Sequence, residues 1–353
     1  NYDTPGSPLT VIDTYGGYII WGDVLEESVG SHVETQSAYV NDTWRVNDKL
    51  TVNLGVRYDK HDVTDQAGAT TVDDDRWSPR LSASYDIKGD GTIILTAGFN
   101  RYVTAFTQNQ GTAGSAAGEP LYNWYLYGGP QVIAGTPEHP TNSDALDAMF
   151  DWFFNVYGGP NNLDLAYYIS VPGLTPRVGD NLRAPYGDEY TVGASFRLGN
   201  RGVVRADYVH REYGSFYASE IVPGSIVEVP VIGGAVSDQA VDINDDSVYG
   251  REYDAIMARF DYRIGSRWNI GANYTWSEAW GNFDGETFDS GPVPGSFFEY
   301  TEYKEASWNV PDGLLGIDQT HKFRAWVVWD AIATSHHNLS LSLLQNFFSG
   351  TPY

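Results

Sequence analysis

The chain has 353 residues, and 46 acidic residues against 21 lysines and arginines give it a formal net charge of -25. A surface this negative repels phosphate backbones, which argues against nucleic-acid binding. Cysteine is absent, so disulfides and thiolate metal sites are excluded. No stretch approaches the ~20 apolar residues of a membrane helix, although membrane strands carry their apolar residues in alternation, where such a count misses them.

Residues 1–31 are mixed in character and contain one possible short strand, Tyr18–Trp21. The first clear element is a hairpin over residues 37–59, with Asn47 and Asp48 at its turn. Its return arm has a period of two, because its apolar residues all fall on one side of a strand: Leu50, Val52, Leu54, Val56 and Tyr58.

The same pattern returns four times. The further hairpins have arms over 81–85 and 95–99, 190–198 and 204–208, 256–264 and 268–276, and 323–329 and 339–343. Tight turns join these arms near 88–91, 199–202, 265–266 and 335–337. Several arms are longer than the ~5–6 residues typical of soluble sheets and reach the ~9–11 needed to cross a bilayer.

Longer stretches without alternation separate the hairpins, and we predict loops at 62–76, 107–184, from the third hairpin to about Gly250, and at 281–318. The longest of these, 107–184, contains one amphipathic helix. Asn142 or Ser143 is expected to cap it and Gly158 to end it. Its apolar stripe consists of Leu146, Met149, Phe150, Phe153 and Tyr157.

Short turns that alternate with long loops are typical of outer-membrane barrels, whereas a soluble β-sandwich has no reason to sort its loops by length. The sequence therefore predicts an all-β fold: an antiparallel transmembrane β-barrel segment of about ten long strands, with short periplasmic turns and long extracellular loops. Lipid should contact Leu50, Leu54, Ala194, Phe196, Ile270 and Tyr274. The lumen should receive Asn53, Arg57, Ser195, Arg197, Asn269 and Asn273.

Catalytic motifs are missing: the sequence has no Gly-x-Ser-x-Gly elbow, His-Glu-x-x-His pair, phosphate loop or dinucleotide fingerprint, and we expect neither an enzyme nor a cofactor. Oxygen ligands for a metal occur at Asp73 and Asp75, and again at Asp242, Asp245 and Asp246. Neither group has calcium-loop spacing, so a hydrated acidic loop is the default interpretation of both.

Aromatic residues within 107–184 are the best candidates for contact with a ligand: Tyr122, Trp124, Tyr125, Tyr127, Trp152 and Phe154. Such side chains stack on a sugar or grip a peptide, but a long ordered loop also needs aromatics to pack against itself. Both interpretations remain open at this stage.

Several segments resemble TonB-dependent outer-membrane receptors. SAYVNDTWRVNDKLTVNLGVRYD is similar to a hairpin of that family, and WSPRLSASYDIKGDGTIILTAGFNRY to the next one. LRAPYGDEYTVGASFRLG, REYDAIMARFDYRIGSRWNIGANYTWSEAWGN and the final FSGTPY resemble the Oar-like branch, whose members often carry a carboxypeptidase-regulatory-like domain.

The resemblance implies a 22-stranded barrel closed by an N-terminal plug and driven through a TonB box by the inner-membrane motor. Residues 1–353 would then be a fragment of the barrel domain, without the plug, the TonB box and the last strands, and with open sheet edges. The implied partners are outer-membrane lipid, the TonB motor complex and an unknown extracellular ligand.

The implied function is capture and import of a scarce ligand across the outer membrane of a Gram-negative bacterium. A barrel that binds without transporting, as an adhesin or a subunit of a surface complex, is the alternative. We place ligand capture in the 107–184 loop, because it is the longest loop on its rim and contains the amphipathic helix.

Overall fold

One large antiparallel sheet dominates the computed structural model, which describes residues 17–106, 114–162, 164–174, 176–179, 182–229, 234–244, 246–283 and 312–352. For residues 167, 176, 217–229 and 234–243 only the backbone is described. The long strands of the sheet are β2 (His32–Arg45), β3 (Leu50–Thr64), β4 (Thr70–Asp86), β5 (Ile93–Val103), β9 (Tyr186–Leu198), β10 (Gly202–Gly214), β13 (Arg251–Ile264), β14 (Trp268–Gly281), β16 (His321–Ala333) and β17 (Asn338–Phe348).

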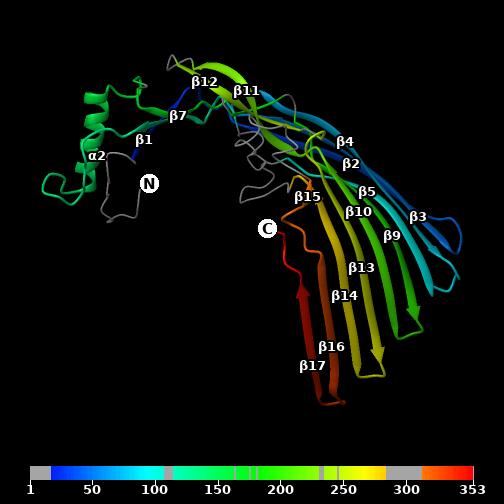
Figure 1. Ribbon diagram of the computed structural model, residues 1–353. Coiled ribbons are helices and arrows are strands. Elements are labelled where there is room, and N and C mark those ends of the chain that lie inside the picture. The colour runs from blue at the N-terminus through cyan, green and yellow to red at the C-terminus, as the bar shows by residue number, and fades with distance from the viewer. Residues whose placement is uncertain are drawn as a thin grey trace.

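These strands follow one another in chain order, from β2 at one end of the sheet to β17 at the other, and the short β15 (Gly313–Leu314) pairs with β14. All five predicted hairpins are present. The sheet curves without closing on itself (Figure 1), so the expectation of an open barrel segment is confirmed.

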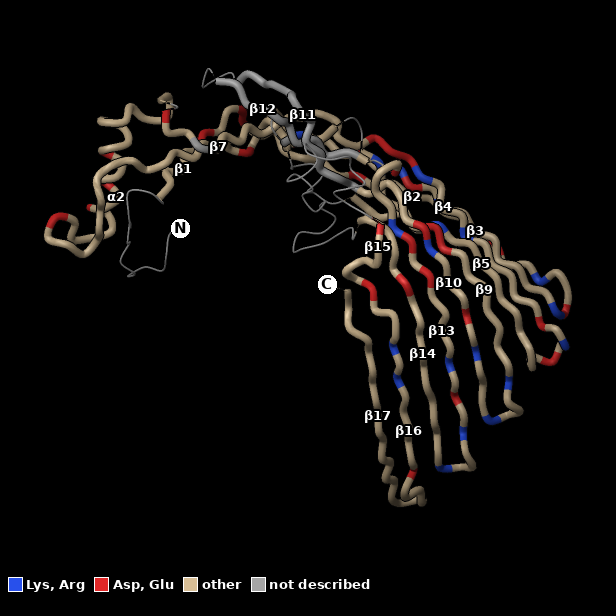
Figure 2. The backbone as a smooth tube through the Cα atoms, in the orientation of Figure 1, with Lys and Arg blue, Asp and Glu red and all other residues tan. Residues whose placement is uncertain are grey.

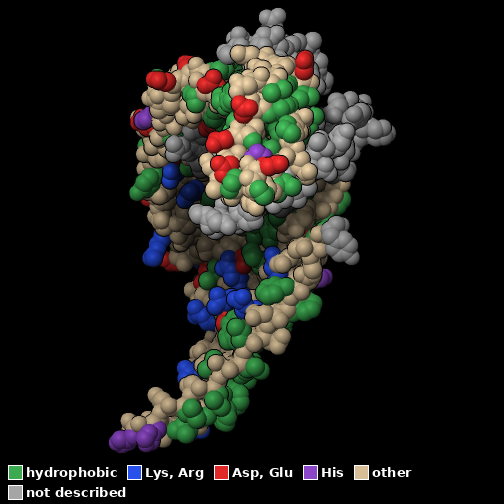
Figure 3. Space-filling model, turned by 90° about the vertical axis from the view of Figure 1, so that its left-hand side faces the viewer, with side chains coloured by type: hydrophobic (Ala, Val, Ile, Leu, Met, Phe, Trp, Pro, Cys, Tyr) green, Lys and Arg blue, Asp and Glu red, His purple; other side chains and the backbone are tan. Residues whose placement is uncertain are grey.

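The strand register gives the sheet one apolar and one polar face. One continuous row across seven strands consists of Leu95, Ala194, Ala206, Ala258, Tyr274, Phe323 and Phe347. The neighbouring row on the other face consists of Ser195, Arg205, Arg259, Asn273, Arg324 and Asn346. Hydrophobic and basic side chains accordingly lie on opposite sides of the lower strands in Figure 3.

The residues predicted to contact lipid and those predicted to line the lumen lie on these two faces as expected. On the apolar face, Leu54, Phe196 and Tyr274 remain exposed. On the polar face, arginines pair with aspartates two residues further along the same strand: Arg57 Nε donates to Asp59 at 2.8 Å and Arg205 Nε to Asp207 at 2.7 Å. The charges of these two arginines are therefore balanced within their own strands.

The predicted tight turns all lie at one end of the sheet. In the first of them, the side-chain oxygen of Asn47 accepts the backbone N–H groups of Lys49 and Leu50, both at 2.9 Å. At the opposite end, the predicted loop over 62–76 is wrong. β3 continues to Thr64 and β4 starts at Thr70, which leaves only 65–69 as the connection.

The extension was missed because its pairing is polar. Lys60 lies opposite Asp75, and its Nζ atom is 3.8 Å from a carboxylate oxygen of Asp73. Alternation of apolar and polar residues indicates a strand only where one of its faces is apolar. Where both faces of a strand are polar, as at the ends of β3 and β4, the sequence no longer shows this alternation.

The stretches 107–184 and 209–250 also contain strands where only loops were predicted. β6 (Pro120–Leu126) pairs with β7 (Ala166–Ser170) and with the distant β1 (Tyr18–Val24) in a three-stranded sheet. β11 (Tyr217–Val229), β12 (Gly234–Asn244) and β8 (Pro176–Val178) form another. In β6, both faces carry large apolar or aromatic side chains, such as Tyr122 on one and Tyr125 on the other, and this removes the alternation that would have predicted a strand.

The helix is present as α2 (Asn142–Asp151), continued by the π-helical turn η1 (Trp152–Tyr157). Thr141 caps it, which corrects the predicted cap at Asn142 or Ser143. The Thr141 hydroxyl accepts the backbone N–H of Asp144 at 3.2 Å, and the Asp144 carboxylate accepts the N–H of Thr141 at 2.9 Å. Gly158 ends the helical segment in the left-handed conformation, with φ of 103°, as predicted.

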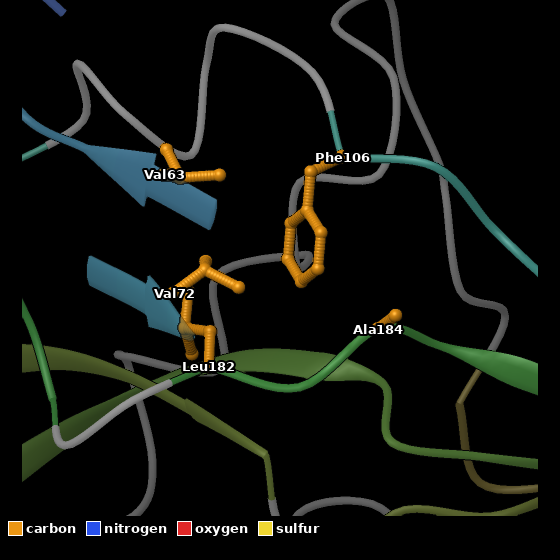
Figure 4. Packing of buried hydrophobic residues seen from close by; sticks show 5 residues of the cluster. All are labelled: Val63, Val72, Phe106, Leu182 and Ala184. Atoms are coloured by element: carbon orange, nitrogen blue, oxygen red, sulfur yellow. The ribbon is translucent and has the colours of Figure 1, made fainter. Parts of the chain in front are cut away.

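The base of the 107–184 stretch is fixed to the ends of β3 and β4. Val63, Val72, Phe106, Leu182 and Ala184 bury one another there (Figure 4). The backbone N–H of Leu182 donates to the Thr71 carbonyl at 3.0 Å, and that of Ala184 to the Asp74 carboxylate at 2.9 Å. The segments entering and leaving this stretch are therefore held to the long strands.

Among the residues that the structure describes, no helix has the length and apolarity needed to cross a membrane.

Candidate binding surfaces at the loop end

Two surfaces at the loop end of the strands are candidates for ligand contact. The first belongs to the loop platform, which we define as β1, β6, β7, α2 and η1. In Figure 1 it extends away from the long strands at the end opposite the tight turns. The second is a cleft on the polar face of the large sheet.

A core of aromatic residues holds the loop platform together. Ile19, Tyr125, Tyr127 and Phe153 are buried between the three-stranded sheet and the helical segment. The Tyr125 ring lies 5.2 Å from that of Phe153 in an edge-on contact. The sheet and the helix therefore pack as one rigid unit.

Both buried tyrosines use their hydroxyls inside this unit. Tyr125 donates to the Pro160 carbonyl and Tyr127 to the Pro130 carbonyl, each at 2.6 Å. Burial raises the pKa of both hydroxyls. They are neutral structural donors, so these two of the six candidate aromatics pack the loop against itself.

The other candidates lie closer to solvent. Trp152 is half-buried between Tyr157 and Tyr127, with ring centroids 5.6 and 4.9 Å away. Gly129 makes room for this stack, since a Cβ there would stand 2.7 Å from the Trp152 ring. Phe154 is exposed and meets Trp21 edge-on at 5.2 Å.

Tyr122 and Trp124 lie on the opposite side of the three-stranded sheet from the helix. The register groups them with the side chains that we call the aromatic face: Ile20, Tyr122, Trp124, Leu126 and Tyr168. Trp124 contacts the ring of Tyr168 edge-on at 6.2 Å and that of Tyr18 at 5.7 Å. The structure thus buries Tyr125 and Tyr127, places Trp152 and Phe154 on the helical segment, and leaves Tyr122 and Trp124 on the other side of the sheet.

The second surface, which we call the polar cleft, has a volume of about 470 Å³. Two adjacent rows of the polar face form its floor. The first row contributes Tyr102, Gly187, Tyr213 and Arg251, and the second contributes Glu189 and Arg211. The wall includes Thr104, Pro185, Tyr186 and Phe216.

Charge and aromatic surface meet in the polar cleft. Arg211 Nε donates to Glu189 at 2.7 Å, and the Glu189 side chain is nearly buried. The Arg251 guanidinium lies 4.3 Å from the Tyr213 ring centroid and 4.9 Å from that of Phe216. Such a cleft suits a planar or anionic group, which stacks on the rings and meets guanidinium donors.

The cleft residues are not among those predicted from the sequence, although a signal for them was present. Glu189 and Arg211 continue the polar sides of β9 and β10, but both lie just outside the predicted arms over 190–198 and 204–208. Only the register places them directly opposite each other.

The acidic groups proposed as metal ligands do not assemble in the part of the chain that the structure describes. Asp73 and Asp75 are exposed strand residues, and Asp246 accepts the backbone N–H of Ser215. Asp245 and the side chain of Asp242 lie outside the described residues. Within the described ranges, no three His, Asp or Glu side chains come together as a metal site.

Comparison with protein families gives a match between residues 1–346 and the model described as TonB dependent receptor-like, beta-barrel. The TonB-dependent transporter Oar of Myxococcus xanthus is 24% identical over 326 residues, covering 90% of this chain and 30% of Oar.

Solved structures with a similar fold include the FrpB iron transporter of Neisseria meningitidis, at 11% identity and a TM-score of 0.48, over 90% of this chain and 33% of FrpB. The siderophore receptor PirA of Pseudomonas aeruginosa is 14% identical with a TM-score of 0.42, over 90% of this chain and 41% of PirA. The chain thus spans about a third of the length of these relatives.

Proposed function

We propose, since this chain belongs to the TonB-dependent receptor-like β-barrel family, that it forms part of an outer-membrane receptor that captures a ligand from the medium and imports it. The observation that carries the proposal is that short and long connections lie at opposite ends of the long strands. Tight turns occupy one end, and the loop platform and the polar cleft lie at the other.

In an outer-membrane barrel the short turns face the periplasm and the long connections face the medium. The loop platform then meets the ligand first, and the polar cleft lies on the lumen wall below it. We further propose the partners that this role requires: lipid along the apolar face, and the TonB motor acting through a plug and TonB box on the full-length protein.

Deleting residues 119–179 tests the proposal. Among the described residues, the deleted strands β6, β7 and β8 pair with β1, with β12 and with one another, and none pairs with the ten long strands. Membrane insertion should therefore persist. Cells with the full-length receptor would be incubated in their growth medium, and depletion of its compounds followed by mass spectrometry. Compounds that are depleted only by cells with the intact receptor should no longer be depleted by cells with the deletion variant.

Asn200→Gly, in a tight turn at the other end, is the matched control and should leave depletion unchanged. Depletion that survives the 119–179 deletion would contradict capture by the loop platform. The ligand site would then belong to the 219–250 or 281–318 stretches or to the plug.

A further inference from the structure

The loop platform is entirely free of fixed positive charge. The sequence has no lysine or arginine before Arg45 and none between Arg101 and Arg177. Within the same ranges the platform and its connections carry Asp23, Glu26, Glu27, Glu119, Glu138, Asp144, Asp147, Asp151 and Asp164. In Figure 2 the platform shows red segments without blue ones, whereas the long strands carry both colours.

Apolar and aromatic side chains are exposed within this negative field. On the aromatic face, Ile20, Tyr122 and Tyr168 are 51%, 42% and 53% exposed. The opposite side of the sheet packs on Phe153, so the face is held rigid and loses little conformational entropy when a partner binds. Tyrosine and tryptophan rings attract guanidinium and ammonium groups through their quadrupoles.

The size of the aromatic face limits its partner. Three strands spaced about 4.8 Å apart, with up to seven residues rising about 3.3 Å each, give a face of roughly 300 Å². A stable contact between globular proteins buries about 800 Å² on each side. The face therefore fits one short peptide segment better than a folded protein.

We propose that the aromatic face docks a short cationic polypeptide segment, rich in arginine or lysine. This inference deepens the function proposed above, because it gives the chemistry of a partner that the loop platform captures. The negative field attracts such a segment from a distance, and the rings of Tyr122, Trp124 and Tyr168 bind its charged groups at contact. A neutral glycan would gain the stacking without the electrostatic attraction.

Fluorescence anisotropy on the purified full-length receptor in a neutral detergent tests the proposal. The probe is a labelled peptide in which arginine alternates with serine, and the comparison peptide has glutamine in place of arginine. We expect the arginine peptide alone to bind. Its affinity should fall steeply as salt shortens the Debye length from about 30 Å at 0.01 M to about 3 Å at 1 M.

The double variant Tyr122→Ala/Tyr168→Ala should weaken binding of the arginine peptide by about tenfold or more. The matched control is Phe150→Ala/Val156→Ala, which removes exposed apolar residues from the helical side of the same platform and should leave binding unchanged. Equal loss in both double variants would overturn the assignment to the aromatic face.

Other outcomes separate this proposal from the transport role. The proposed preference for a cationic peptide would be overturned if the arginine and glutamine peptides bound equally well. It would also be overturned if the arginine peptide failed to bind while a neutral oligosaccharide bound in a way that depends on Tyr122 and Tyr168. If the 119–179 deletion still abolished uptake in that case, the receptor function would stand. Conversely, peptide binding that depends on Tyr122 and Tyr168 supports this inference even where uptake survives the deletion.

Discussion

Single residues on the long strands have roles set by the side of the strand from which they project. Leu54 and Asn53 are neighbours in β3, yet Leu54 is exposed on the apolar face and the amide of Asn53 donates to the Ser82 hydroxyl at 3.0 Å on the polar face. A substitution therefore has a different cost at two adjacent positions.

Leu54→Arg places a charge where we expect lipid, and it should lower the free energy of unfolding by roughly 2–4 kcal/mol if the position lies near the bilayer midplane. Asn53→Arg is the control on the polar face and should cost much less. Urea unfolding of the full-length receptor in lipid vesicles measures both. Equal costs would contradict the assignment of the two faces.

Arg211 and Glu189 make the second residue-scale prediction. Arg211→Met leaves the nearly buried Glu189 carboxylate without its guanidinium donor and should cost about 1–3 kcal/mol. Adding Glu189→Gln should recover part of that loss, because the uncompensated charge is removed. A double-mutant cycle on the free energy of unfolding measures the coupling, and additive effects would show that the pair contributes nothing.

Elements of this protein derive their stability from different sources. The long strands from β3 to β16 are held by neighbours on both sides. By contrast, α2 is a short helix whose start depends on the reciprocal hydrogen bonds of Thr141 and Asp144. The helix in turn packs on the core that supports the aromatic face. Its cap therefore bears on the rigidity of the loop platform.

Thr141→Ala should cost about 1 kcal/mol of helix stability. The Thr141 hydrogen bonds hold the pKa of Asp144 below its usual value. A lowered folded-state pKa stabilises the helix above the unfolded-state pKa, and this contribution is lost as the pH falls through the folded-state pKa. Hydrogen exchange of the α2 amides should show more protection in the wild type than in Asp144→Asn near neutral pH. A difference that persisted well below the folded-state pKa of Asp144 would contradict this role.

At the scale of the whole molecule, the two ends of the strands define its orientation in the membrane. Residues 1–353 contain no cysteine, so each introduced cysteine is the only thiol in this part of the receptor. We predict that a membrane-impermeant maleimide labels Gln131→Cys, in the exposed connection between β6 and α2, in intact cells. Asn200→Cys, in a tight turn, should react only after the cells are opened. Labelling of Asn200→Cys in intact cells would reverse the proposed orientation.

The sequence by itself determined the long hairpins, their two faces and the resemblance to the receptor family. These features are local: a period of two and a tight turn such as Asn47–Asp48 are complete within about twenty residues. The helix over 142–157 was predictable for the same reason. The predicted cap, Asn142 or Ser143, lies one or two residues after the actual cap at Thr141, because neighbouring polar residues compete for that position.

Only the tertiary structure decided which candidate site residues are accessible. Tyr122 and Tyr125 belong to one short strand, and their alternation shows that they face opposite sides. Which side is buried depends on β1, about a hundred residues earlier in the chain, and on the helix that follows. The polar cleft likewise exists because Glu189, Arg211 and Arg251 come from three paired strands. Contacts between segments so distant in sequence leave no periodic signal in either segment. For this reason these contacts are known only from the pairing of the strands in the folded protein.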